Sequence, residues 1–442
     1  MIENISELYG RHIDEKLVSD SLVQRSTVQK YTPIKIEHNH IYCKRCGQIT
    51  KYIDAKMPND NYYCPICINL GRITLNSPLC YVKEPNDFNI KNPVLTWHGK
   101  LTKEQDACSK DIIKVFNSSE KHLLWAVTGA GKTEMLFFGI EDALKQQKRI
   151  CIASPRVDVC VELYPRIKEA FANTSMILLH GRSEVKYQYC QLTICTTHQL
   201  LRFYKAFDVL IIDEVDSFPF VDNAALYFAA NNAVKEQGAT LYLTATPSEE
   251  LMKQIKRKKI GVSYLPIRFH RHLLPQIKNR HVKEWRGQLT KNKLPASLIR
   301  NIKDKINKQQ RFLLFVPRVA DLKPVSEILS KTFDNSLWRT VHSSDEKRME
   351  KVSQMRNEEL LFLITTTILE RGVTFPGIDV LILGADDDVF SASSLVQIAG
   401  RVGRKKDRPY GDVSFYSSVH TNNIKKAIKQ IKYMNRLAKK LK

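Results

Sequence analysis

The amino-acid sequence predicts an α/β protein in which two parallel-sheet lobes stand in tandem behind a small four-cysteine module. Three observations support this prediction: two CxxC pairs near the N-terminus, a glycine-rich phosphate-loop pattern, and strand-like runs that alternate with helical stretches in two successive blocks. The chain has 442 residues, of which 43% are hydrophobic and 26% are charged, a balance that excludes a disordered or fibrous chain. A chain of this length is expected to form about three domains.

The charge is distributed unevenly along the chain. The net charge is +23, and residues 251–300 hold 14 basic residues and one acid, while residues 401–442 hold 13 basic residues and two acids. These two stretches account for the whole positive excess. A concentrated excess is typical of a protein that binds a polyanion, either nucleic acid or an acidic membrane surface. Solvated basic helix faces are the alternative, and we favour nucleic acid.

Four of the ten cysteines form two CxxC pairs, Cys43 with Cys46 and Cys64 with Cys67. Seventeen residues separate the two pairs, a spacing typical of a four-cysteine zinc site. Zinc prefers four ligands in a tetrahedron, and four thiolates leave no open position for catalysis. The sequence therefore predicts a structural zinc ion in this module.

A phosphate-binding loop follows the predicted strand at residues 122–127. The loop consists of Thr128, Gly129, Ala130, Gly131, Lys132 and Thr133, and an apolar-periodic helix follows it to residue 144. The glycines let backbone N–H groups wrap around phosphates, the lysine reaches the β- and γ-phosphates, and the last threonine is placed to bind Mg²⁺. This strand–loop–helix context predicts a site for ATP and Mg²⁺.

A parallel sheet is predicted around this loop. Strand-like runs alternate with helical stretches at residues 149–154, 176–180, 192–197, 209–214 and 240–246. The run that begins at residue 209 leads into Asp213, Glu214 and Asp216, and sites in α/β proteins lie at the carboxyl ends of strands. We expect Asp213 to complete the Mg²⁺ shell and Glu214 to polarise the attacking water. An ordinary acidic loop is the alternative, which the upstream phosphate loop disfavours.

The alternating pattern starts again after the basic segment. Strand-like runs lie at residues 311–316, 361–367, 380–384 and 412–416, and no second phosphate loop accompanies them. This arrangement predicts a second α/β lobe without a nucleotide site of its own. The predicted organisation is an N-terminal region at 1–90 with the zinc-binding module at 43–67, a first lobe at 91–250, a basic inter-lobe connection at 251–305 and a second lobe at 306–442.

The ordered set of motifs resembles that of superfamily 2 helicases and translocases, whose core is two RecA-like lobes. The matching segments are motif I at 128–133, Ia at 154–156, Ib at 196–197, II at 213–216, III at 244–246, IV at 312–316, V at 367–374 and VI at 397–404. The resemblance covers roughly residues 95–420, and motifs I, II and VI are specific in combination. It implies a nucleic-acid-stimulated ATPase.

This resemblance implies roles for individual residues. The catalytic set would be Lys132, Asp213, Glu214, Arg401 and Arg404, with the two arginines as fingers on the γ-phosphoryl group or, alternatively, in phosphate-backbone or surface contacts. Gly372 would let the backbone pass close to nucleotide or DNA, and Thr244 and Thr246 would link the nucleotide state to lobe closure. The candidate nucleic-acid contacts are Ser154, Arg156, Thr196, Thr197, Thr365 and Thr366.

An adenine-reading element is a further candidate upstream of the phosphate loop. Leu101, Thr102 and Gln105 resemble a shortened form of such an element, in which Gln105 would hydrogen-bond the adenine edge. A helix that starts here and is capped by Thr102 is an equal alternative.

The sequence around the motifs is similar to that of a narrower family. A four-cysteine module directly before the helicase core, together with the segments 155–160, 196–200 and 213–219, resembles the ComFA family of competence ATPases in Gram-positive bacteria. This resemblance implies an ATP-dependent translocase or helicase that acts on single-stranded DNA during uptake of transforming DNA. It also implies the membrane DNA-uptake channel and ComFC as partners. Polarity, duplex unwinding and homo-oligomer formation stay open.

Two other functions compete with this one. A DNA repair or replication-restart helicase would unwind forked duplexes. A non-catalytic zinc-containing scaffold that binds nucleic acid would have no need for Lys132, Glu214 and Arg404 together. RNA as the polymer also stays open, because motifs that follow the backbone do not distinguish the sugar by spacing alone.

The C-terminal tail from Thr421 is predicted to form a basic amphipathic helix. Apolar residues recur at helical spacing, at Ile424, Ile428, Ile431 and Met434, and lysines occupy the other face. We favour packing on the second lobe; contact with DNA or with the anionic inner membrane leaflet is the alternative. No apolar run reaches the ~18 residues of a membrane helix, and the N-terminus lacks the basic residues of a signal peptide. We therefore expect a cytoplasmic protein. A peripheral position at the inner face of the membrane stays open.

Overall fold

The structure is a computed structural model that describes residues 1–442 apart from 184, 372, 406 and 442. The described residues form two units, one made of residues 1–125 and 132–264 and the other of residues 126–131 and 265–442. Within this part of the chain, no helix combines the length and the apolar character that are needed to cross a membrane.

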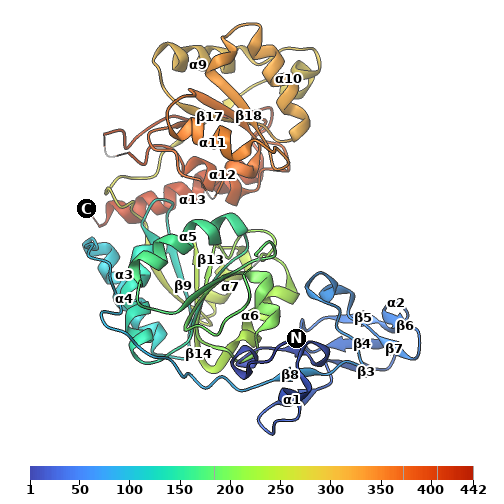
Figure 1. The fold of residues 1–442 in the computed structure, drawn as a ribbon. Coiled ribbons are helices and arrows are strands. Elements are labelled where there is room, and N and C mark those ends of the chain that lie inside the picture. Colours follow the sequence, from blue (N-terminus) through green and yellow to red (C-terminus); the bar gives the residue numbers. More distant parts are fainter. Residues whose placement is uncertain (184, 372, 406, 442) are drawn as a thin grey trace. The chain divides into compact units, whose positions relative to one another are not determined.

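The N-terminal region contains short strands that form two small sheets and a hairpin. One sheet has the order β1-β8-β2, a second has the order β3-β4-β5, and β6 pairs with β7. The strands are β1 Ile13–Asp14, β2 Gln29–Tyr31, β3 Ile34–Glu37, β4 His40–Cys43, β5 Ile49–Lys51, β6 Lys56–Met57, β7 Asn61–Tyr62 and β8 Leu79–Tyr81. The helices are η1 Ile5–Leu8, η2 Glu15–Leu17, α1 Asp20–Val23, α2 Tyr52–Ala55 and η3 Pro65–Leu70. In Figure 1 this region lies beside the first lobe, on the side of α6.

The first lobe is a seven-stranded sheet in the order β11-β12-β10-β13-β14-β9-β15, flanked by helices (Figure 1). Its strands are β9 Lys121–Ala126, β10 Ile150–Ser154, β11 Met176–Leu179, β12 Leu192–Thr196, β13 Phe207–Asp213, β14 Val234–Thr244 and β15 Gly261–Leu265. Its helices are α3 Lys103–Phe116, α4 Lys132–Lys145, α5 Val157–Ala170, η4 Thr197–Arg202, α6 Ala224–Ala233 and α7 Glu249–Lys256. Every residue of β10 and β12 is buried, because helices cover both faces of a parallel sheet.

The second lobe is a six-stranded sheet in the order β16-β21-β20-β17-β19-β18. Its strands are β16 Ile277–His281, β17 Phe312–Phe315, β18 Trp338–Val341, β19 Phe362–Thr365, β20 Asp379–Leu383 and β21 Val413–Ser417. Its helices are α8 Trp285–Thr290, α9 Ala296–Asn307, α10 Val319–Ser330, η5 Asn335–Leu337, α11 Arg348–Arg356, η6 Thr367–Leu369, α12 Ala392–Ala399 and α13 Asn422–Lys439. All strand pairs of this sheet are parallel, which confirms the prediction of two parallel-sheet lobes.

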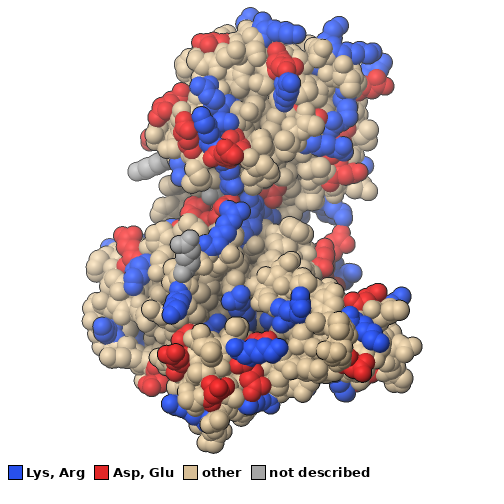
Figure 2. Space-filling view, turned by 45° about the vertical axis from the view of Figure 1, so that its right-hand side comes forward, with Lys and Arg blue, Asp and Glu red and all other residues tan. Residues whose placement is uncertain are grey.

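The basic stretch at 251–305 contributes to both lobes in addition to connecting them. It contains β15, an edge strand of the first sheet, and β16, an edge strand of the second, as well as α8 and α9. The polar sequence of β16 hides its strand character, because an edge strand exposes much of its surface. On the face shown in Figure 2, Lys and Arg side chains are scattered over both units among acidic ones.

The C-terminal helix packs on the second lobe. Helix α13 contacts α12, and its apolar residues Ile424, Ile431 and Met434 are buried. Thr421 caps the helix by accepting a hydrogen bond from the backbone N–H of Ile424. The amphipathic pattern of the tail therefore reflects packing, and its lysines face outward.

Candidate nucleotide and zinc sites

The predicted phosphate loop connects the end of β9 to the first residue of α4, Lys132. Gly129 and Gly131 have φ values of 78° and 74°, in the left-handed region that glycine adopts without strain. Such a turn directs successive backbone N–H groups inward, and the helix N-terminus adds a positive dipole. The residues present fit a bound polyphosphate, and Thr133, predicted to bind Mg²⁺, lies in the first turn of α4.

The first acid of motif II lies within reach of this loop. The Nζ atom of Lys132 is 3.5 Å from Oδ1 of Asp213, the last residue of β13. Burial raises the pKa of Asp213, and the Lys132 cation opposes that rise. Asp213 would hold a divalent cation through its carboxylate when one is bound at this loop.

The second acid, Glu214, occupies a turn of the backbone. Its φ is 54°, its N–H donates to Oδ1 of Asp213 at 2.9 Å, and its Oε2 accepts from the hydroxyl of Ser217 at 3.3 Å. The Asp213 carboxylate contacts Lys132, whereas the Glu214 carboxylate contacts Ser217. One acid can therefore serve a metal while its neighbour serves a water molecule.

The predicted coupling residues converge on one carboxylate. The hydroxyls of Thr244 and Thr246 donate to Oδ1 and Oδ2 of Asp216, each at 2.5 Å. Trp125 Nε1 donates to the carbonyl of Ala245 at 3.0 Å. Motif III is thereby tied to motif II at one side and to β9 at the other.

The motif VI arginines are held by backbone carbonyls within the second unit. Arg401 is 4% exposed, and its guanidinium donates to the carbonyl of Val373 in motif V. Arg404 has a φ of 62° and its Nε donates to the carbonyl of Gly400 at 3.0 Å. Gly372, predicted to approach nucleotide or DNA, lies outside the described residues.

The predicted nucleic-acid contacts differ in how accessible they are. Ser154, Thr197 and Thr365 are fully buried, and the hydroxyl of Thr365 donates to the carbonyl of Val341 at 3.1 Å. Thr196 and Thr366 are buried except for a small exposed area, and Arg156 at the start of α5 is half-buried. Arg156 is thus the most exposed of the six candidates and the most accessible to a nucleic-acid strand. The candidates at the ends of β-strands are buried because they belong to the sheet.

Gln105 takes part in a capping box at the start of α3. Its Oε1 accepts from the N–H of Thr102 at 2.9 Å, and its own N–H donates to Oγ1 of Thr102 at 3.3 Å. The structure therefore bears out the helix-cap alternative. The adenine contact stays a prediction for the amide nitrogen of this side chain.

The four predicted zinc ligands come together in the N-terminal region. Their Sγ atoms all lie within 4.8 Å of one another, and all four cysteines are buried. The Cys43–Cys67 and Cys46–Cys64 sulfur pairs are 3.9 Å and 3.6 Å apart. Tetrahedral zinc with Zn–S bonds of ~2.3 Å places its sulfurs ~3.8 Å apart, so the cluster fits a zinc ion.

Arg45, inside the first CxxC pair, supports this cluster. Its Nε donates to Sγ of Cys67 at 3.4 Å, and its Nη2 donates to the carbonyls of Cys67 and Gly71 at 3.0 Å and 2.9 Å. An N–H···S bond of this kind orients a thiolate and stabilises its negative charge. Sequence reasoning missed this residue, although its place between two ligands was a usable signal.

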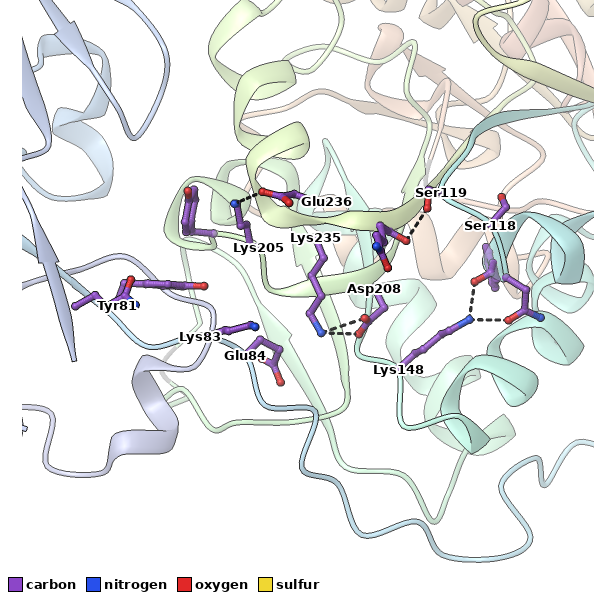
Figure 3. Close-up of a pocket in the computed structure, with 15 residues that line it drawn as sticks. Tyr81, Lys83, Glu84, Ser118, Ser119, Lys148, Lys205, Asp208, Lys235 and Glu236 are labelled. Atoms are coloured by element: carbon purple, nitrogen blue, oxygen red, sulfur yellow. Dashed lines mark hydrogen bonds and ion pairs between the residues drawn. The ribbon is translucent and has the colours of Figure 1, made fainter. Parts of the chain in front are cut away.

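A pocket lies at the end of the strands of the first sheet that is opposite to the phosphate loop (Figure 3). It has a volume of about 750 Å³ and lies beside the residues that precede β10 and β13. Three of its four lysines have partners: Lys235 pairs with Asp208, Lys205 with Glu236, and Lys148 donates to Asn117. Because the phosphate loop lies at the carboxyl end of β9 and this pocket lies at the other end of the strands, the pocket is not the nucleotide site.

Two protein-family models match the two halves of the helicase core. Residues 98–249 match the family model described as "Type III restriction enzyme, res subunit", and residues 291–406 match the model described as "Helicase conserved C-terminal domain". The chain is 40% identical to the competence protein ComFA of Bacillus subtilis over 445 residues, covering 98% of this chain and 95% of that protein. It is also 40% identical to ComFA of Streptococcus pneumoniae over 433 residues, covering 97% and 98%.

More distant similarities cover the helicase core. The replication restart protein PriA of Rickettsia felis is 29% identical over 238 residues, covering 49% of this chain and 35% of that protein. Among solved structures, Saccharomyces cerevisiae Dbp5 bound to RNA and ADP BeF3 superposes with a TM-score of 0.55 at 13% identity, covering 77% of this chain and 94% of that one. The helicase Lhr of Mycobacterium smegmatis bound to ssDNA and AMP-PNP gives a TM-score of 0.54 at 15% identity, covering 74% and 48%. The two structural matches establish the fold alone.

Proposed function

Because the chain belongs to the ComFA family, a family of superfamily 2 helicase ATPases, we propose that it uses ATP hydrolysis to move along single-stranded DNA during uptake of transforming DNA. Membership makes the chain a competence helicase or translocase. We propose in addition that its substrate is single-stranded DNA and that it translocates along this DNA. The excess of basic residues supports a track held mainly through its phosphates.

The observation that carries the proposal is the meeting of Lys132 and Asp213 beside Glu214. The phosphate loop would bind the triphosphate, with Lys132 on its β- and γ-phosphates. Glu214 would orient the attacking water and accept its proton. Asp213 and Thr133 would hold Mg²⁺, which when bound neutralises charge on the phosphate oxygens.

Motif VI would complete this reaction from the second lobe. We assign Arg404 and Arg401 the role of arginine fingers, which stabilise the charge that develops on the γ-phosphoryl group and accelerate hydrolysis by ~10³–10⁵ in related enzymes. Both arginines donate to a backbone carbonyl, but Arg401 is buried whereas Arg404 is half-buried, so Arg404 is the better candidate for direct contact.

The four-cysteine cluster would bind zinc as a structural ion. Four buried sulfurs at tetrahedral separations, with an arginine donating to one of them, support this assignment. The family also suggests a complex with ComFC and the membrane DNA-uptake channel, with the protein at the inner face of the membrane.

The first experiment measures ATP hydrolysis by the purified protein alone and with single-stranded DNA, duplex DNA or single-stranded RNA. Glu214→Gln is the matched control, because it keeps the shape of the side chain and removes the base. Strong stimulation by single-stranded DNA that is lost in Glu214→Gln supports the proposal. Preferential stimulation by RNA would overturn the DNA assignment, and hydrolysis that survives in Glu214→Gln would overturn the assigned base.

A second experiment separates translocation from unwinding. Displacement of streptavidin from one end of a biotinylated single strand reports directional movement, and a forked duplex reports strand separation. Movement without efficient fork unwinding is expected. Efficient fork unwinding would favour the replication-restart alternative, which the partial similarity to PriA suggests.

A further inference from the structure

A buried arginine outside every predicted motif contacts motif VI. Arg268 follows β15 in a segment without helix or strand, and it is 4% exposed. Its Nη1 donates to the carbonyl of Val402 at 2.7 Å, and its Nη2 donates to the carbonyl of Gly400 at 3.0 Å. The planar guanidinium therefore spans two carbonyls of the turn that carries the motif VI arginines.

The Arg268 guanidinium has no acidic partner among the residues that the structure describes. Its side-chain hydrogen bonds go to backbone carbonyls. Burial lowers the pKa of Arg268 to about 9, and the neighbouring Arg404 cation acts in the same direction. The group is still protonated at neutral pH. A buried charge compensated only by backbone dipoles is costly, and such groups cluster at functional sites.

The turn that Arg268 holds has an uncommon backbone. Gly403 and Arg404 follow one another with φ values of 79° and 62°, both in the left-handed region. For a residue with a side chain this conformation persists only where the surroundings impose it. The carbonyl of Gly400 accepts from both Arg268 and Arg404, so the two arginines share one anchor.

We propose that Arg268 is a positioning residue for ATP hydrolysis: it clamps the carbonyls of Gly400 and Val402 and thereby fixes the turn that presents Arg404. The inference rests on the proposed function, which gives Arg404 its role on the γ-phosphate. Arg268 acts through this turn and not on the substrate. A lysine cannot replace it fully, because one ammonium does not reproduce the two-pronged geometry.

The test is a double-mutant cycle on DNA-stimulated ATP hydrolysis. The variants are Arg268→Gln, Arg268→Lys, Arg404→Gln and the double variant Arg268→Gln/Arg404→Gln. We expect kcat to fall about 10- to 100-fold in Arg268→Gln, with KM for ATP changed less than about threefold and with Arg268→Lys in between. The double variant should be no slower than Arg404→Gln alone, because Arg268 has nothing left to position.

The matched control is Arg280→Gln. Arg280 is an exposed arginine of β16 whose Nε donates to Oγ of Ser414, and its loss should leave kcat within about twofold of wild type. Thermal unfolding of each variant shows whether it is folded. If Arg268→Gln does not fold, the cycle is run with Arg268→Lys and Arg280→Lys.

Two outcomes would overturn the inference. If the losses in the double variant multiply, Arg268 acts independently of Arg404. If Arg268→Lys matches Arg280→Lys in kcat, the clamp has no bearing on hydrolysis. Full activity of Arg404→Gln would be a different failure, because it would remove the finger from the proposed function itself.

Discussion

Asp216 accepts a hydrogen bond from the hydroxyl of Thr244 through Oδ1 at 2.5 Å, and its other oxygen accepts from Thr246. The pair joins the loop after β13 to the end of β14. Thr244 is fully buried and Asp216 nearly so, which strengthens a charge-assisted bond. A change in the position of motif II on ATP hydrolysis would therefore move motif III with it.

Replacing Thr244 by valine is expected to uncouple hydrolysis from movement. The substitution keeps the shape of the side chain and removes one hydroxyl from a buried carboxylate, at a cost of about 1.5–3 kcal/mol in folding free energy. The ratio of streptavidin displacement to ATP hydrolysed should fall severalfold. Thr193→Val is the control, because the buried Thr193 hydroxyl has no hydrogen-bond partner in the described structure. An unchanged ratio in Thr244→Val would refute the coupling role.

Glu84 and Arg149 form a buried ion pair that fastens the N-terminal region to the first lobe. Both side chains are 0% exposed, and Arg149 also donates to the carbonyl of Tyr9 at 3.1 Å. Glu84→Gln would leave the guanidinium buried without a carboxylate, which we expect to cost about 3–5 kcal/mol. Urea unfolding measures this cost, and limited proteolysis should cut the chain between residues 84 and 102.

The comparison for this pair is Glu236→Gln. Glu236 is an exposed partner of Lys205, so its replacement should leave the unfolding midpoint near that of wild type. Equal midpoints for Glu84→Gln and Glu236→Gln would show that the buried pair does not fasten the region.

Arg45→Met is expected to weaken zinc binding without removing a ligand. The change removes the N–H···S bond to Cys67, and loss of such a supporting group typically costs about 10- to 100-fold in metal affinity. Equilibrium competition with a colorimetric chelator measures the zinc affinity. Lys44→Met alters the neighbouring exposed residue of the same CxxC pair and should keep the wild-type affinity. Equal affinities for both variants would argue against the supporting bond.

His12 should make the N-terminal region sensitive to acid. Its ring stacks on Tyr204 with centroids 4.4 Å apart, and burial, with a smaller contribution from the Arg45 cation, lowers its pKa to about 3. The unfolded chain binds the proton near pH 6.5, so this contribution to stability is complete above pH 6.5 and declines by about 1.4 kcal/mol per pH unit as the pH falls toward 3.

The measurement for His12 is the urea unfolding free energy between pH 4.5 and 7.5. His12→Phe should show a flatter decline below pH 6.5 than wild type, because it removes the titrating group. His420→Phe, at an exposed histidine, should follow the wild-type curve. Parallel curves for wild type and His12→Phe would contradict the assignment.

Much of the core could be predicted because its strands and helices follow from local patterns of apolar residues. Apolar runs such as 149–154 and 209–214 became β10 and β13, and the helix predicted after Thr421 became α13. Strands β16 and β18 escaped prediction. The sequence of β16, Ile277–His281, carries two basic residues and a histidine, and its strand conformation depends on pairing with β21.

The sequence by itself determined the phosphate loop, the motif II acids and the four cysteines, because their chemistry depends on residue type at short spacing. Only the tertiary structure decided that Thr365 is buried and that Arg268 contacts motif VI. The second outcome depends on atoms that meet across more than a hundred residues of chain, as those of Arg268 and Val402 do. Short-range patterns specify elements and ligands, whereas burial and hydrogen-bond partners are set by packing between elements.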